Sequence, residues 1–106
     1  MAEKAAGRTR NIVVVGDKPT MNYVVACLTL FNSGFSDIRV RARGRNISRA
    51  VDVVEMMRRV FIKGLVVANV DIGTDHLTGS NGESASVSAI EIKLVKPSAQ
   101  DLSSVF

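Results

Sequence analysis

The most distinctive chemistry in this 106-residue sequence is carried by a short run of arginines. Five lie between positions 39 and 49 with no acidic residue among them: Arg39, Arg41, Arg43, Arg45 and Arg49. In a β-strand the first three would share one face, where like charges about 7 Å apart repel unless an anion bridges them. The planar guanidinium also fits a phosphate. The run therefore predicts a phosphate-binding surface rather than a face that only aids solubility.

A second candidate for phosphate contact is the turn formed by residues 16–19, Gly-Asp-Lys-Pro. It follows an apolar run and precedes a predicted helix, so Lys18 would lie near the free amides of a helix N-terminus, where phosphates bind. The spacing matches neither the P-loop nor the dinucleotide-binding fingerprint. Taken alone, the turn favours a structural role over phosphate binding.

No catalytic or metal-binding set accompanies the basic residues. Cys27 is the only cysteine and His76 the only histidine, which excludes an internal disulfide and a multi-thiolate metal site. Ser80 and Ser84 have no base in their sequence context. We therefore expect no enzyme activity, no catalytic residue, no cofactor and no metal. A small enzyme that clamps a phosphorylated metabolite with its arginines is the weakest alternative.

The composition is that of one folded domain. With 46% hydrophobic and 23% charged residues the chain can bury a core without disulfides or metals. We place the domain at residues 11–96, between an N-terminal tail at 1–10 and a C-terminal tail at 97–106. No apolar stretch approaches the roughly 20 residues of a membrane-spanning helix, and the N-terminus lacks a signal-peptide pattern. We expect a cytoplasmic protein.

Hydrophobic periodicity predicts the first strand and helix. Residues 12–15 form a continuous β-branched run, typical of a strand buried on both faces. Asp17 is expected to cap a helix that tolerates Pro19 in its first turn and runs to about Asn32. Gly34 is expected to stop this helix.

Residues 36–43 alternate apolar and basic side chains, which predicts a strand with one buried and one wet face. Gly44 ends it, and Asn46 is a candidate N-cap for a second helix that continues to Gly64.

Residues 65–72 and 87–95 predict two further strands, joined by a polar loop at 73–86 that contains the turn signal Asn81-Gly82. They should form a hairpin with a projecting tip. The order β-α-β-α-β-β then gives an α/β two-layer sandwich, in which both helices cover one face of a four-stranded mixed sheet.

Both helices are more apolar than this architecture requires. The predicted sheet-facing side of the first helix comprises Met21, Val24, Val25, Leu28 and Phe31, yet its opposite side carries Tyr23, Ala26, Cys27 and Leu30. In the second helix the predicted stripe of Ile47, Ala50, Val51, Val54 and Phe61 is widened by Val53, Met56 and Val60. The stripe spans roughly 220°, against about 100° for an ordinary surface helix. This excess indicates a partner interface, and a symmetric homodimer is the commonest partner.

Two stretches form long motifs in a fixed order: VVVGDKPTMNYV at 13–24 and RARGRNISRAVD at 41–52. Both resemble the Alba family of archaeal chromatin proteins, and the resemblance covers roughly residues 10–96. It implies a fold similar to the C-terminal domain of the third translation initiation factor. It also implies a homodimer that binds double-stranded DNA and RNA with little sequence preference, compacts chromatin, and is associated with the chromosome.

The residues and the resemblance together give a predicted set of nucleic-acid contacts: Lys18, Asn22, Tyr23, Arg41, Arg43, Arg45 and Arg49. Family members also reach along the duplex with a hairpin arm, which here is residues 73–86. Its candidate contacts are Thr74, His76, Thr78, Ser80, Asn81, Gly82 and Ser84. Phe61 falls where the family places an aromatic residue of the contact between neighbouring dimers.

The sequence departs from the family pattern at three acidic residues. Asp17 stands where the family often has a lysine that is acetylated in some members, so that switch cannot operate at this position. Asp75 and Glu83 make the arm less basic than in many members. These changes predict weaker binding per dimer, or a shift toward cooperative packing. They suggest a divergent second paralogue, which could also form a heterodimer.

An arginine strand that grips phosphates does not by itself separate DNA from RNA. An RNA-binding subunit or RNA chaperone, in a setting like that of ribonuclease P, therefore stays open as the alternative function.

Overall fold

The computed structural model describes residues 11–97, so both predicted tails lie outside the described residues apart from Pro97. Along the chain the elements are β1 (Ile12–Val14), α2 (Thr20–Asn32), β2 (Asp37–Arg43), α3 (Ile47–Met56), β3 (Val66–Thr78) and β4 (Ser84–Val95). A 3₁₀ turn, Gly44–Asn46, precedes α3, and a π-helical turn, Met57–Phe61, extends it. Within residues 11–97, no helix combines the length and apolarity needed to cross a membrane.

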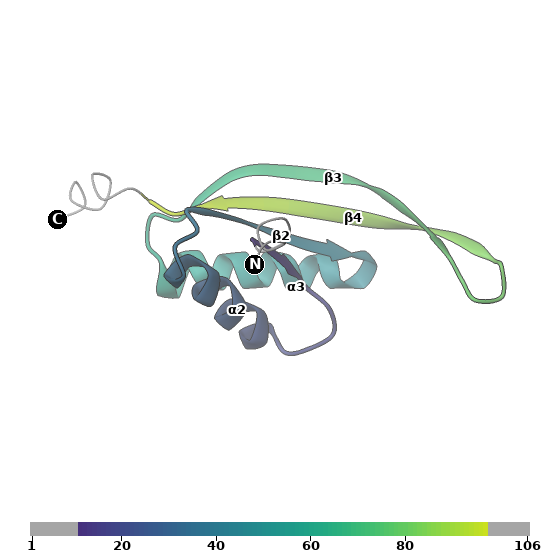
Figure 1. Cartoon of the computed structure of the whole chain (residues 1–106), viewed down its shortest axis with the longest axis horizontal. Coiled ribbons are helices and arrows are strands. Elements are labelled where there is room, and N and C mark those ends of the chain that lie inside the picture. The colour runs from purple at the N-terminus through teal and green to yellow at the C-terminus, as the bar shows by residue number, and fades with distance from the viewer. Residues whose placement is uncertain (1–10, 98–106) are drawn as a thin grey trace, which may run out of the picture.

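The four strands form one mixed sheet in the order β1-β2-β4-β3. β1 runs parallel to β2, whereas β4 is antiparallel to both β2 and β3. Both helices lie against one face of this sheet, and the opposite face is open (Figure 1). The predicted α/β two-layer sandwich and its β-α-β-α-β-β order are confirmed.

The core lies between the sheet and the helices, because alternate side chains of β2 and β4 point to the covered face. Ile38 and Val40 of β2 and Leu94 of β4 are fully buried, which confirms the predicted inward positions. Gly34, with φ of +114°, turns the chain from α2 toward β2 in a conformation that favours glycine. This confirms the predicted stop of the first helix.

The structure corrects the predicted orientation of α2. The helix buries Val24, Cys27 and Phe31, whereas Met21 and Val25, expected to face the sheet, are 44% and 54% exposed. Apolar residues lie on nearly every side of this helix, so the periodicity did not determine its rotation about its own axis. Cys27, which was placed on the side away from the sheet, is fully buried, and that burial raises the pKa of its thiol to about 12.

The predicted stripe of the second helix is partly wrong for the same reason. α3 buries Ala50, Val53 and Val54, but Val51 and Phe61 are exposed. Val53, which was assigned to the surplus apolar side, is therefore a core residue. The surplus that remains at the surface is smaller than the sequence suggested.

The segment around β1 differs from expectation in two ways. Val14 pairs with Arg41 on the open face and is 65% exposed, so in the single chain β1 is not buried on both faces. Pro19 occupies the cap position of α2 without a side-chain hydrogen bond, and Asp17 does not cap this helix. Asn46 occupies the cap position of α3 but also makes no capping hydrogen bond.

The projecting hairpin is confirmed, but most of it is strand rather than loop. β3 continues to Thr78 and β4 begins at Ser84, so only residues 79–83 form the turn, closed by the Gly79 amide donating to the Glu83 carbonyl at 2.7 Å. The polar composition of 73–86 resembled a loop because both faces of this ribbon meet solvent. We call residues 74–88, which lie beyond the last pairing of β2 with β4 (Arg43 with Ala89), the arm (Figure 1).

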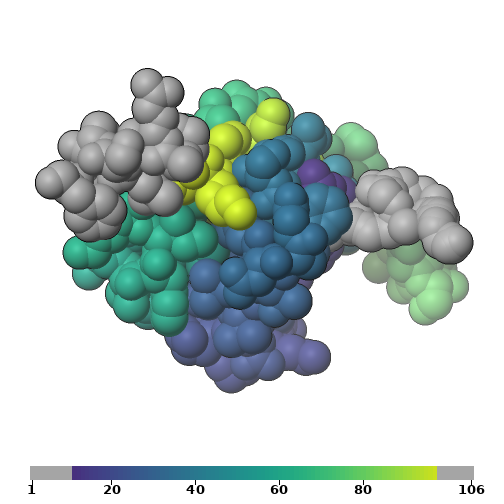
Figure 2. Space-filling view, turned by 60° about the vertical axis from the view of Figure 1, so that its left-hand side comes forward, coloured from purple at the N-terminus to yellow at the C-terminus, as the bar shows by residue number. Residues whose placement is uncertain are grey.

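Viewed toward one end in Figure 2, the helices and β2 form a continuous packed body, and the green arm tip lies behind it at the right. Figure 1 shows the arm extending beyond the end of β2 and of the helices.

Candidate functional site

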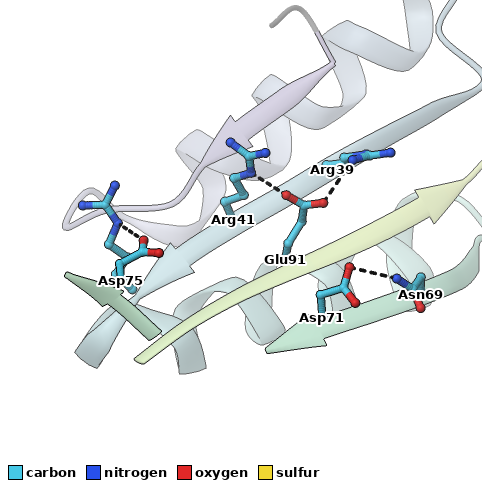
Figure 3. Close-up of polar contacts among 7 residues, drawn as sticks. Arg39, Arg41, Asn69, Asp71, Asp75 and Glu91 are labelled. Atoms are coloured by element: carbon cyan, nitrogen blue, oxygen red, sulfur yellow. Dashed lines mark hydrogen bonds and ion pairs between the residues drawn. The ribbon is translucent and has the colours of Figure 1, made fainter. Parts of the chain in front are cut away.

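The three arginines of β2 share the open face of the sheet, as the alternation predicted. Arg41 lies directly opposite Glu91 in the register of β2 and β4. Glu91 accepts hydrogen bonds from Arg39 Nη1 at 3.2 Å and from Arg41 Nε at 2.5 Å (Figure 3). A carboxylate of the chain itself therefore relieves the expected repulsion between these arginines. The hydrogen bond from Arg41 is the main cause that holds the pKa of Glu91 below its ordinary value.

Two further arginines of the segment meet acids from distant elements. Arg43 reaches past β4 to Asp75 at the arm base, with 2.9 Å between its Nε and the Asp75 Oδ2 (Figure 3). Arg45 Nη2 lies 2.9 Å from Asp17 Oδ2 in the turn before α2. Residues 39–49 contain no acidic residue, but the fold brings acidic partners to the arginines from three other parts of the chain. The absence of acidic residues within the run therefore does not extend to the folded site, where four of the five arginines pair with a carboxylate.

The turn at Lys18 and the start of α3, separate in sequence, form one group in the structure. The Lys18 amide donates to the Tyr23 hydroxyl at 3.1 Å, and the Lys18 carbonyl accepts from Arg49 Nη1 at 3.0 Å. With the Asp17–Arg45 pair, these contacts unite Asp17, Lys18, Arg45 and Arg49, which we call the Lys18 cluster. Three of its four side chains are basic. This arrangement can hold an anion of the phosphate type.

The members of the Lys18 cluster differ in how firmly they are held. Arg49 bonds to the backbone of the turn, and its Nε is buried without a hydrogen-bond partner among residues 11–97. Arg45 and Asp17 are both well exposed. Hydrogen bonds from Arg45, and then from Asn46, hold the pKa of Asp17 below its ordinary value. Asp17 is therefore a carboxylate at neutral pH.

The other predicted residues of the body lie in two places. Asn22 and Tyr23 are in the first turn of α2, where with Lys18 they help to line a hollow of about 510 Å³ between β1 and α2. The Tyr23 hydroxyl is already engaged by the Lys18 amide. Phe61 is exposed at the end of the π-helical turn, at the other end of α3 from Arg49. The structure does not bring Phe61 together with the other candidates.

All seven predicted contacts of the arm are exposed: Thr74, His76, Thr78, Ser80, Asn81, Gly82 and Ser84. Their hydroxyls, amides and imidazole can donate and accept hydrogen bonds without adding a fixed charge. His76 Nδ1 lies 3.1 Å from the Ser86 Oγ across the ribbon. Since Asp75 is paired with Arg43, its charge at the arm base is balanced within the chain.

Sequence reasoning did not identify Glu91 as part of the site. Glu91 lies within the strand predicted at 87–95, but the sequence did not place that strand beside the one predicted at 36–43. The missing information was the strand order, which makes Glu91 the neighbour of an arginine 50 residues earlier. An outward acid in one strand and outward arginines in another are the signal that could have suggested this pairing.

Comparison with known proteins gives consistent matches. The family model described as Alba matches residues 11–74. The DNA/RNA-binding protein Alba of Methanocella arvoryzae is 45% identical over 89 residues, which cover 84% of this chain and 93% of that relative. The DNA/RNA-binding protein Alba 1 of Archaeoglobus fulgidus is 51% identical over 86 residues, covering 81% and 96% respectively.

The solved structures agree. Alba from Thermoplasma volcanium superposes with a TM-score of 0.76 at 46% identity, covering 81% of this chain and all of that one. An Alba protein of Trypanosoma brucei gives a TM-score of 0.71 at 28% identity, covering 92% and 79%. The sequence identity, the shared fold and the coverage establish that this chain belongs to the Alba family.

Proposed function

We propose that this protein binds double-stranded DNA and RNA through their phosphate backbones, with little preference for sequence, and that it organises the chromosome in this way. The observation that carries the proposal is the Lys18 cluster, in which Arg45 and Arg49 reach the Asp17–Lys18 turn, the first through the Asp17 carboxylate and the second through the Lys18 carbonyl. Support also comes from relatives that are named for DNA and RNA binding.

The contacts suggest that the basic residues have different roles in binding. Arg39 and Arg41 are engaged by Glu91, whose side chain is only 22% exposed, so they mainly shape the open face. Arg43, Arg45 and Lys18 are exposed and are the groups from which phosphates can be reached. The arm adds uncharged hydrogen-bonding groups along the duplex. Phosphate contacts fix position without conveying sequence, which accounts for binding that is indifferent to sequence.

The binding experiment uses two unrelated duplexes of about 20 base pairs and a series of salt concentrations. We expect nearly equal affinities and a log-log salt slope of several units, because each neutralised phosphate contributes about 0.9. The double variant R43Q/R45Q should weaken binding to both duplexes alike and leave the fold intact by circular dichroism. A flat salt dependence, or loss of affinity for only one duplex, would contradict the proposal.

We further propose that the working unit is a homodimer. The single chain exposes large apolar side chains on α3, on the π-helical turn after it and on β3, among them Val51, Val60, Val66, Val70 and the 82% exposed Ile72. A two-fold pair would cover such surface and double the number of phosphate contacts. A heterodimer with a paralogue, and side-by-side packing of dimers through the exposed Phe61, are extensions of the same proposal.

Sedimentation equilibrium tests the dimer. We expect a species of twice the chain mass of 11.4 kDa at micromolar concentration. A particle that remains at the single-chain mass would refute the dimer.

RNA binding as the main role is the second candidate, because the relatives are named for both nucleic acids. Sequencing the nucleic acid that crosslinks to the protein in its own cells decides between them. Recovery spread over the chromosome supports the architectural role, whereas recovery confined to a few RNAs supports an RNA-binding subunit or chaperone.

A further inference from the structure

Asp17 is an acid inside an otherwise basic group. Its Oδ2 lies 2.9 Å from Arg45 Nη2, and the two side chains are 66% and 81% exposed. A carboxylate and a phosphate present the same kind of oxygen acceptors to a guanidinium. In this structure the carboxylate therefore occupies a position on Arg45 that a phosphate of a nucleic acid would need.

The Asp17–Arg45 pair is the most exposed of the acid–arginine contacts of the site, ahead of Arg43 and Asp75, which are 57% and 45% exposed. Glu91 is largely covered and bonded to two arginines, so replacing it would break two contacts at once. The Asp17–Arg45 pair lies in open solvent, and exposed pairs of this kind are weak. A phosphate therefore has open access to Arg45 while the pair is formed.

The backbone beside Asp17 is held in place, which makes the exchange costly. The amide of the next residue, Lys18, donates to the Tyr23 hydroxyl, and its carbonyl accepts from Arg49. After a phosphate takes Arg45, the turn cannot withdraw from the site without breaking these bonds. The displaced carboxylate therefore stays close to the incoming phosphate, and the two like charges repel.

We propose that Asp17 is an internal competitor of the nucleic-acid phosphate for Arg45, and that it lowers and tunes the affinity of the Lys18 cluster. The proposal rests on the proposed function and specifies how one part of that site is regulated. Binding at Arg45 is then an exchange of a carboxylate for a phosphate rather than simple addition to a free cation.

The test compares D17N with a matched control, E55Q, in the full chain. Glu55 pairs with Arg58 at 2.9 Å on the helical segment after the site, and it is also exposed. Both substitutions raise the net charge by one and release one exposed arginine, but only D17N acts at Arg45. Affinity for an unrelated duplex is measured by fluorescence anisotropy over a range of salt concentrations, after thermal unfolding has shown that both variants are folded.

We expect D17N to bind about two- to fivefold more tightly per chain than wild type, the scale of one exposed ion pair. Its salt slope should be steeper by about 0.9 per chain in contact, because the displaced carboxylate no longer retains a cation. E55Q should give a clearly smaller gain. In an R45Q background, the gain in affinity from D17N should be no larger than the gain from E55Q.

The outcomes separate the two proposals. If wild type binds with a steep salt dependence but D17N and E55Q raise the affinity equally, the proposed role of Asp17 is overturned. The proposed function is then untouched. A D17N gain that persists undiminished in the R45Q background would also overturn the proposed role of Asp17, because Arg45 would not be the contested group. A wild type without salt-dependent binding would overturn the proposed function and this inference with it.

Discussion

The two faces of the sheet are built from the same strands but are held by different forces. On the covered face Ile38, Val40 and Leu94 are fully buried against the helices. On the open face their neighbours Arg39 and Glu91 are linked by ion pairs that remain partly in solvent. Burial of apolar surface stabilises a fold strongly, whereas partly exposed ion pairs contribute little. Stability and binding should therefore be separable by changing residues on one face at a time.

The largest effect is expected on the covered face. Leu94→Ala leaves a cavity beneath the helices and should lower the free energy of unfolding by about 2–5 kcal/mol. The control is Lys93→Ala, the adjacent residue on the open face, which should change it by less than about 0.5 kcal/mol. Urea unfolding at one fixed protein concentration measures both, since oligomerisation makes stability depend on concentration. Equal losses in the two variants would remove the distinction between the faces.

A smaller effect is expected on the open face. Glu91→Gln should cost up to about 1 kcal/mol at neutral pH for each of the two partly exposed ion pairs that it removes. The pKa of Glu91 is lowered in the folded chain by Arg41. Its contribution is therefore fully present above the ordinary pKa of 4.5 and is lost as the pH falls through the lower folded value.

The measurement is the urea midpoint of wild type and E91Q from neutral pH down to about pH 3. The two curves should converge at the acid end, where the wild-type carboxyl is protonated. A constant gap across the whole range would show that the substitution acts through packing instead.

Local patterns predicted the parts of the fold that depend on neighbouring residues. The alternation in β2 separated Ile38 and Val40 from the arginines, and the structure confirms each assignment. Gly34 marked the end of α2 because its positive φ is a local requirement. The turn signal predicted the hairpin. The length of its strands was underestimated, because their polar Thr and Ser residues were interpreted as part of a loop.

Properties that depend on distant parts of the chain could not be predicted in this way. Val25 was placed toward the sheet because α2 is apolar on nearly all sides, and only its packing shows that Val24 and Cys27 face inward. The acidic partners of the arginines are likewise set by the packing of distant parts of the chain. Asp17 precedes Arg45 by 28 residues and Glu91 follows Arg41 by 50, so no spacing rule brings them together.

The long arm has a consequence for the dynamics of the protein. Residues 84–88 of β4, which precede Ala89, pair only with β3, so the outer arm is a two-stranded ribbon without a helix over it. Such a ribbon is only marginally stable by itself. Its amides should exchange with solvent through local opening, while those of β2 and inner β4 should exchange only when the whole domain unfolds. The arm can then change its shape to follow a groove without any loss in the thermal stability of the body.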